Sequence, residues 1–119
     1  MVEKINRHAN EIGVEVVCKQ SNHEGVLVDE IQAAYGEIDG IVINPGAYTH
    51  TSIALLDALK AVGIPTVEIH ISAVEKREDF RQVSYVRAAC LATITGHGTG
   101  GYLEAMTLLK QRLEASDHE

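Results

Sequence analysis

The sequence predicts an α/β fold in which a doubly wound parallel sheet has helices on both faces. Short runs rich in valine and isoleucine alternate along the chain with segments whose apolar residues recur every three or four positions. The short runs are apolar on both faces, as in the buried strands of a parallel sheet. The length of 119 residues and the 45% content of hydrophobic residues predict one domain over residues 1–119.

Four segments have the apolar spacing of helices. Gly13, Gly36 and Gly63 follow the first three segments, as glycine does where a helix ends. Either Thr51 or Ser52 is placed to cap the third helix. The predicted helices are Val2–Ile12, Val26–Tyr35, Ile53–Val62 and Tyr102–Leu113.

Four shorter runs have the composition of strands. The predicted strands are Val14–Val17, Ile38–Ile43, Thr66–Ile71 and Ala88–Thr95. Asn44-Pro45-Gly46 breaks the second strand, and Gly96–Gly101 forms a glycine-rich turn after the fourth. The charged segment Glu75–Arg81 is expected to be a loop with a short helical turn. The predicted order begins with a helix, whereas doubly wound domains of this size usually begin with a strand.

Charge and composition argue against several partners. A net charge of −7 would be repelled by nucleic acids and by anionic membranes, and aromatic residues make up only 4% of the chain. We find neither an apolar run of about 20 residues nor the apolar core of a signal peptide, so we expect a cytoplasmic protein. Cys18 and Cys90 each lie in an apolar run, and we expect two buried, reduced thiols.

Polar residues follow three of the predicted strands. Because ligands of parallel sheets bind beyond the carboxyl ends of the strands, these residues are expected to share one rim. Arginine as a fork for a carboxylate and histidine as a proton donor indicate a pocket for a small, oxygen-rich anion. The residues concerned are Ser21–Glu24, Asn44–Ser52, Glu68, His70, Ser72, Arg77 and Arg81.

Each of these residues also has a purely structural explanation. Arg77 and Arg81 could pair with Glu78 and Asp79 on the surface, and His50 could satisfy a buried turn. The turn Gly96–Gly101 lacks the lysine and the spacing of a nucleotide phosphate loop, which argues against nucleotide binding.

Taken together, the segments resemble type II 3-dehydroquinate dehydratase in order and spacing. The stretches that carry the resemblance are Gln20–Gly25, Ile43–Ser52, Val67–Ser72, Arg77–Arg81, Ser84-Tyr85 and Gly96–Leu103. The resemblance implies a flavodoxin-like fold and the anti elimination of water from 3-dehydroquinate through an enolate, with no metal and no cofactor. The product is 3-dehydroshikimate, in aromatic amino-acid biosynthesis or in quinate breakdown. A homo-oligomer of trimers assembled into a dodecamer is also implied.

The resemblance further implies roles for individual residues. His70 corresponds to the general acid that protonates the leaving hydroxyl, and Glu68 to the carboxylate that supports it. Arg77 belongs to a mobile lid, and Asp57 reaches the site of a neighbouring subunit. The implied substrate ligands are Asn44 and His50 for hydroxyl groups, Ile71 and Ser72 for the carboxylate, and Arg81 for a ring hydroxyl.

The sequence departs from the family pattern in two places. The family's first strand and the following loop, with its tyrosine base and arginine, are not found in it. We therefore expect a sheet without its first, central strand, and no appreciable activity from this chain unless a longer chain or a partner supplies that segment. The alternatives are a non-catalytic binding module and a signalling or nucleotide-binding domain of the same fold. Near the lid, Ala73, Glu75 and Gln82-Val83 differ from the family.

Overall fold

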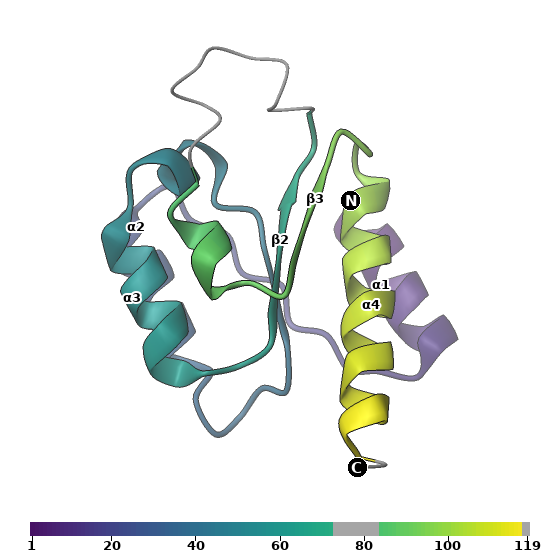
Figure 1. The fold of residues 1–119 in the computed structure, drawn as a ribbon. Helices are drawn as coiled ribbons and strands as arrows, with labels where there is room; N and C mark the ends of the chain where they lie inside the picture. Colours follow the sequence, from purple (N-terminus) through teal and green to yellow (C-terminus); the bar gives the residue numbers. More distant parts are fainter. Residues whose placement is uncertain (73–83, 118–119) are drawn as a thin grey trace.

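A parallel sheet lies between two layers of helices in the computed structural model, which describes residues 1–72 and 84–117 (Figure 1). The described strands are β1 (Ile41–Ile43), β2 (Thr66–His70) and β3 (Ala92–Thr95). They lie in the order β1-β2-β3, with Val67 of β2 opposite Val42 on one side and Ala92 on the other. The α/β class and the parallel sheet are confirmed.

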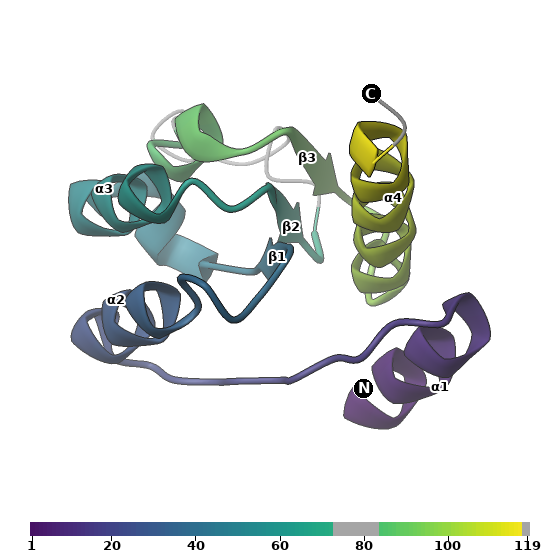
Figure 2. The same ribbon diagram turned by 90° about the horizontal axis from the view of Figure 1, so that it is seen from below.

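Helices from both halves of the chain cover the two faces of the sheet. The helices are α1 (Val2–Ile12), α2 (Glu24–Ala33), α3 (Ile53–Val62) and α4 (Gly100–Asp117). Figure 2 shows α2 and α3 on one face, and α4 with α1 beyond it on the other. Two 3₁₀ turns, η1 (Gly46–His50) and η4 (Val86–Ala89), lie on the α3 side. The predicted covering of both faces is therefore confirmed.

The predicted helices are all present, with changes at some of their ends. The bounds of α1 and α3 are those predicted, and Gly13 and Gly63 end them with φ of 75° and 65°, in the left-handed region. Ser52, not Thr51, caps α3, because its hydroxyl accepts from the Leu55 N–H at 3.0 Å. Helix α2 begins two residues before the predicted start, and α4 is longer than predicted at both ends.

The prediction of a strand at Val14–Val17 is wrong. The segment alternates between partly buried and exposed residues, but it pairs with none of the described strands. Val14 and Val16 pack with Ile5, Ala9 and Met106 instead. Because α1 and α2 lie on opposite faces, the connection between them passes around the β1 edge of the sheet (Figure 2). The described sheet accordingly has three strands rather than four.

The strands predicted at Ile38–Ile43 and Ala88–Thr95 are shorter than expected at their N-terminal ends. Residues 34–38 form a turn in which the Ala34 carbonyl accepts from the N–H groups of Glu37 and Ile38. The 3₁₀ turn η4 replaces the start of the last strand, and the Ser84 hydroxyl accepts from the Arg87 N–H at 3.1 Å there. Local hydrogen bonds thus outcompete strand pairing at both positions.

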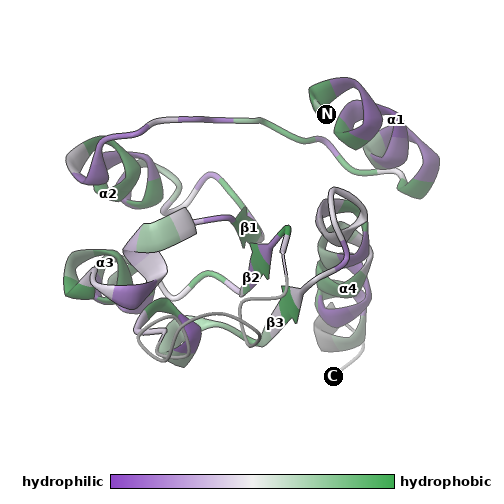
Figure 3. Ribbon diagram, turned by 90° about the horizontal axis from the view of Figure 1, so that it is seen from above, coloured by the Kyte–Doolittle hydropathy of each residue, from purple (hydrophilic) through white to green (hydrophobic). Residues whose placement is uncertain are grey.

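The two faces of β2 have different chemistry. Val67 and Ile69 are fully buried against Ala105 and Leu109 of α4. Thr66, Glu68 and His70 alternate with them and therefore face the α3 layer. On that side a second apolar cluster contains Ile31, Ile43, Leu55, Ala58, Leu59 and Val86. Figure 3 shows both apolar and polar residues on the helices of each layer. Apolar clusters pack on both faces of the sheet, so the polar face of β2 is an exception within the interior.

The cysteines differ from the prediction of two buried thiols. Cys18 is exposed, because it lies in the unpaired connection between α1 and α2. Cys90 is partly buried, and its thiol donates to the Val86 carbonyl at 3.3 Å. Within residues 1–72 and 84–117, the structure contains no helix long and apolar enough to cross a bilayer.

Candidate active site

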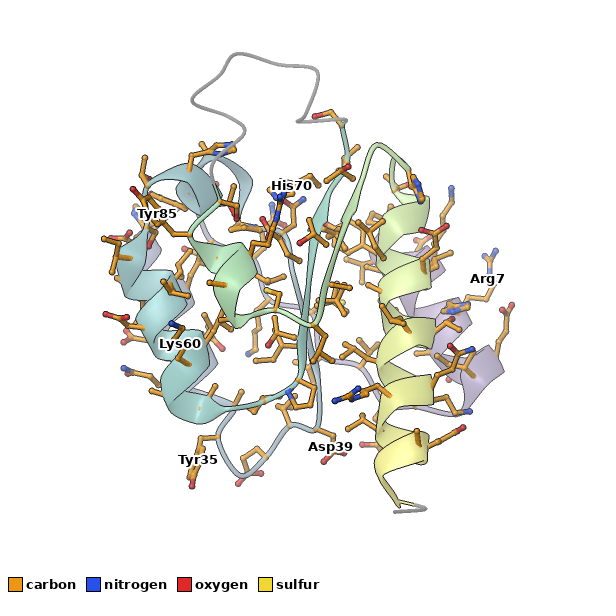
Figure 4. The ribbon with its side chains drawn as sticks, in the orientation of Figure 1. Arg7, Tyr35, Asp39, Lys60, His70 and Tyr85 are labelled. Carbon is orange, nitrogen blue, oxygen red and sulfur yellow. The ribbon has the colours of Figure 1, made fainter. Side chains whose placement is uncertain are left out.

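A buried carboxylate and a buried imidazole lie side by side at the carboxyl end of β2. The Nε2 atom of His70 is 2.5 Å from Oε2 of Glu68, and the two residues are 6% and 0% exposed. The strand brings them together because residues i and i+2 point to the same face. In Figure 4, His70 lies at the end of the sheet opposite Tyr35 and Asp39. Glu68 and His70 thus form a chemically defined pair at the end of the sheet where the site was predicted.

Three hydroxyl groups surround the same carboxylate. Thr49 Oγ1 lies 2.5 Å from Glu68 Oε2, and Ser84 Oγ lies 3.0 Å from Oε2 and 3.2 Å from Oε1. Thr93, the register partner of Glu68 on β3, contributes a longer contact of 3.4 Å to Oε1. The donors come from η1, from the residues before η4 and from β3. Glu68 is therefore the point at which three elements join β2 through polar contacts.

These contacts set the ionisation of Glu68. Burial raises the pKa of Glu68, since a charged carboxylate loses its hydration. Hydrogen bonds from His70, Thr49 and Ser84, together with the positive charge of His70, act in the opposite direction, and the pKa lies below its ordinary value. The carboxylate is thus an acceptor, and the proton of the short contact to His70 is on Nε2.

Two further predicted site residues lie at the carboxyl end of the sheet, and one of them contacts this pair. The ring of His50, the last residue of η1, stacks on the ring of His70 with a centroid distance of 6.5 Å and an interplanar angle of 17°. Asn44 follows β1 and is exposed. Its Nδ2 donates to the Tyr102 hydroxyl at 3.0 Å, and its Oδ1 accepts from the Gly46 N–H at 3.2 Å. Both residues are therefore held at the carboxyl end of the sheet.

The residues after β2 are fixed through their backbone. Ile71 and Ser72 are exposed, and their carbonyls accept from the N–H groups of Gly98 and Gly96 at 3.0 and 3.2 Å. The glycine-rich turn thus holds the end of β2. Its two positive φ values, 75° at Gly96 and 57° at Gly98, explain why glycine occupies these positions.

The other predicted site residues are not part of this cluster in the described structure. Asp57 is exposed in the middle of α3, and none of the hydrogen bonds among the described residues joins it to Glu68 or His70. The polar segment Ser21–Glu24 leads into α2, and the carbonyl of Asn22 accepts from the Tyr48 hydroxyl at 2.9 Å. Arg77 and Arg81 lie outside the described residues.

Four residues of the site were given no role from the sequence. Thr49, Ser84 and Thr93 bind Glu68, and Tyr102 binds Asn44. The available signals were indirect. Thr49 lies in the predicted pocket segment Asn44–Ser52, and Thr49, Ser84 and Tyr102 lie in segments that carry the family resemblance. The contacts join residues up to 58 positions apart, so the local sequence pattern does not reveal them.

The arrangement is suited to proton transfer. It combines a buried acid and base pair with neighbouring amide, imidazole and hydroxyl groups. In the described part of the chain, no group of three histidine, cysteine or carboxylate residues is placed to hold a metal ion. Fold and site together are suited to an α/β enzyme with acid–base groups at the carboxyl end of a parallel sheet.

Comparison with known proteins identifies the family. The family model for dehydroquinase class II matches residues 1–110, so the chain belongs to that family. It is 50% identical over 115 residues to the 3-dehydroquinate dehydratase of Clostridium perfringens strain ATCC 13124, and the match covers 96% of this chain and 80% of the relative.

Solved structures agree with this assignment. The type II dehydroquinase from Butyrivibrio crossotus is 49% identical, with a TM-score of 0.89 over 92% of this chain and 77% of that one. The enzyme from Propionibacterium acnes is 36% identical, with a TM-score of 0.86 over 90% and 74% of the two chains. The predicted family and the predicted class of enzyme, a hydro-lyase, are confirmed.

Proposed function

We propose that this protein converts 3-dehydroquinate to 3-dehydroshikimate and water through an enolate, with His70 as the general acid and without a metal or cofactor. The observation that carries the proposal is the buried pair of Glu68 and His70, in a chain half identical to a 3-dehydroquinate dehydratase. Glu68 as an anion is placed to stabilise the positive charge of His70 while the ring carries its second proton.

The reaction requires two proton transfers. A base takes the proton beside the ketone, and the electron pair of the broken C–H bond forms the enolate. The enolate then collapses to re-form the ketone, and its electron pair forms the new carbon–carbon double bond as the bond to the leaving oxygen breaks. That oxygen receives a proton from His70 and departs as water. Because Nε2 of His70 donates to Glu68, we assign this transfer to Nδ1. We assign proton abstraction to none of the described residues.

The remaining site residues would bind the substrate. We propose that Asn44 and His50 bind its hydroxyl groups, that Ile71 and Ser72 bind its carboxylate, and that Arg81 binds a ring hydroxyl. The stacking of His50 on His70 and the position of Asn44 after the carboxyl end of β1 support this proposal. Arg77 is proposed to belong to a lid over the pocket.

The two proton transfers can be tested separately. In deuterated water, NMR follows both the exchange of the substrate proton beside the ketone and the appearance of 3-dehydroshikimate. In a chain that carries the family's tyrosine base, we expect His70→Ala to retain the exchange and to lower dehydration by about 10²–10⁴-fold, the usual contribution of a general acid. Dehydration at the unsubstituted rate by His70→Ala would contradict the proposed role.

The same measurement distinguishes the non-catalytic alternative. A binding module retains the pocket, so calorimetry would show that 3-dehydroquinate binds while NMR shows neither exchange nor dehydration. Exchange and dehydration together would establish the lyase.

We further propose that the protein assembles as trimers within a dodecamer in the cytoplasm, with Asp57 reaching a neighbouring site. The exposed position of Asp57 on α3 supports its availability to a neighbour. Light scattering is expected to report a mass far above the 12.9 kDa of one chain. A monomer at micromolar concentration would contradict the assembly.

A further inference from the structure

We propose that Thr49 and Ser84 are positioning residues that keep the Glu68 carboxylate ionised and oriented against His70. Glu68 is fully buried, and a buried carboxylate without donors is expected to take up a proton. The effect of this positioning on catalysis rests on the proposed function, because Glu68 acts on the substrate through His70. The effect on Glu68 itself can be measured without substrate.

The hydroxyl protons of Thr49 and Ser84 both belong to a hydrogen-bonded group around the Glu68 carboxylate. The Arg87 N–H donates to Ser84 Oγ at 3.1 Å, which leaves the Ser84 proton free for another acceptor. Thr49 and Ser84 are also 2.5 Å apart, and Ser84 is within reach of both oxygens of Glu68. If Thr49 donates to Glu68, the Ser84 proton goes to Glu68 or to Thr49 Oγ1. In either arrangement the chain of donors ends on the carboxylate.

The backbone fixes both hydroxyls in place. The Tyr85 N–H donates to the Thr49 carbonyl at 2.8 Å, which ties η1 to the residues before η4. Thr49 is 0% exposed and Ser84 is partly buried. Hydroxyls held in this way lose little further freedom when they bind the carboxylate, unlike hydroxyls on the surface.

Few other charges act on this carboxylate in the described structure. On its own strand the neighbour is His70, against which the ring of His50 stacks from η1. Cys90 interacts electrostatically with Glu68, and Arg87 of η4 acts on Cys90. Because burial raises the pKa of the Cys90 thiol to about 12, this thiol is neutral and adds no charge at neutral pH. Apart from His70, the hydroxyls of Thr49 and Ser84 are therefore the main groups that favour the charged form of Glu68.

The test compares four substitutions in the full chain, and a fifth assigns the signal of Glu68. Thr49→Val and Ser84→Ala each remove one hydroxyl from Glu68, and Thr49→Ser retains it. Thr66→Val is the matched control, because Thr66 is a buried threonine on the same face of β2 whose hydroxyl donates to the Ile64 carbonyl instead. Carbon-13 NMR of the glutamate carboxyl groups follows the titration of Glu68, and Glu68→Gln assigns its signal.

We expect Thr49→Val and Ser84→Ala each to raise the pKa of Glu68 by about 1, since each removes a hydrogen bond to the charged form. Thr49→Ser and Thr66→Val are expected to leave the pKa of Glu68 unchanged. An unchanged titration of Glu68 in both hydroxyl deletions, or an equal change in Thr66→Val, would overturn the proposal. Those results would leave Thr49 and Ser84 with a packing role only.

The kinetic consequence is a separate readout. In the active enzyme, Thr49→Val and Ser84→Ala should lower kcat by about tenfold with little change in KM, and they should move the acidic limb of the kcat profile to higher pH. A changed Glu68 titration without any dehydration by an otherwise unsubstituted chain that carries the family's tyrosine base would refute the proposed function and support the positioning role. A changed titration with unaltered kcat would overturn the catalytic part of the proposal.

Discussion

At the scale of single residues, burial has opposite consequences for Glu68 and Cys90. Both side chains lose hydration, which by itself raises a pKa. Glu68 has enough donors to reverse the effect, whereas Cys90 has mainly the negative charge of Glu68 nearby, which adds to it. Burial therefore leaves Glu68 charged and Cys90 neutral because only Glu68 has several hydrogen-bond donors.

The stability of the protein is expected to fall in acid because of Glu68. A carboxyl group whose pKa is lowered by folding stabilises the fold at pH values above its pKa in the unfolded chain, about 4.3. This contribution is lost as the pH falls through the pKa of the folded state. We expect Glu68→Gln to cost about 1–3 kcal/mol at pH 7, and the gap to the unsubstituted protein to narrow toward pH 3. Urea unfolding across this range measures it; a constant gap would contradict the assignment.

The two thiols should react at different rates. A pKa of about 12 against the ordinary 9.0 leaves Cys90 about a thousandfold less thiolate than an ordinary thiol at pH 8. Cys18 is exposed, so iodoacetamide should label it first, and mass spectrometry of the digested protein locates the label. Labelling of Cys90 before Cys18 would contradict the structure.

At the scale of elements, the cap of α3 connects local sequence to the site. Helix α3 begins soon after η1, so its cap Ser52 also fixes the position at which η1, with His50, ends. We expect Ser52→Ala to lower the free energy of unfolding by about 1 kcal/mol, because the Leu55 N–H loses its acceptor. Thermal unfolding measures the loss. The control is Thr51→Ala at the neighbouring exposed position, where a comparable loss would show that the cap is misassigned.

Strand β1 has one edge that no described strand covers. The Ile41 N–H donates to Pro65 of the β2 side at 2.9 Å, and because strand residues alternate, the amide of Val42 faces the other edge. Hydrogen exchange followed by NMR should therefore find the Val42 amide much less protected than that of Val67 in the central strand. Equal protection would mean that the outer edge of β1 is covered.

At the scale of the whole molecule, stability depends on apolar layers on both sides of the sheet. Leu109 of α4 is 6% exposed and packs with Val67 and Ile69, whereas the adjacent Leu108 is 37% exposed. We expect Leu109→Ala to cost about 2–5 kcal/mol through the cavity it leaves. Leu108→Ala should cost less than about 1 kcal/mol. Denaturant unfolding of both variants provides the comparison, and similar losses would place α4 in a different orientation.

The sequence by itself determined the features that depend on neighbouring residues. Apolar spacing and the following glycines were enough to predict α1 and α3, because such periodicity and caps act within a few residues. The spacing of Glu68 and His70 on one strand likewise placed both on one face. The family resemblance, carried by contiguous motifs such as Ile43–Ser52, was readable in the same way.

Only the tertiary structure decided where distant segments meet. Val14–Val17 has the composition of a strand but is not one here, because a strand requires a partner and the described chain provides none beside it. Thr49 and Ser84 look like ordinary turn residues until folding brings their hydroxyls to Glu68. A side chain's local pattern sets its direction, whereas its hydrogen-bond partners, and with them the ionisation of Glu68, depend on long-range packing.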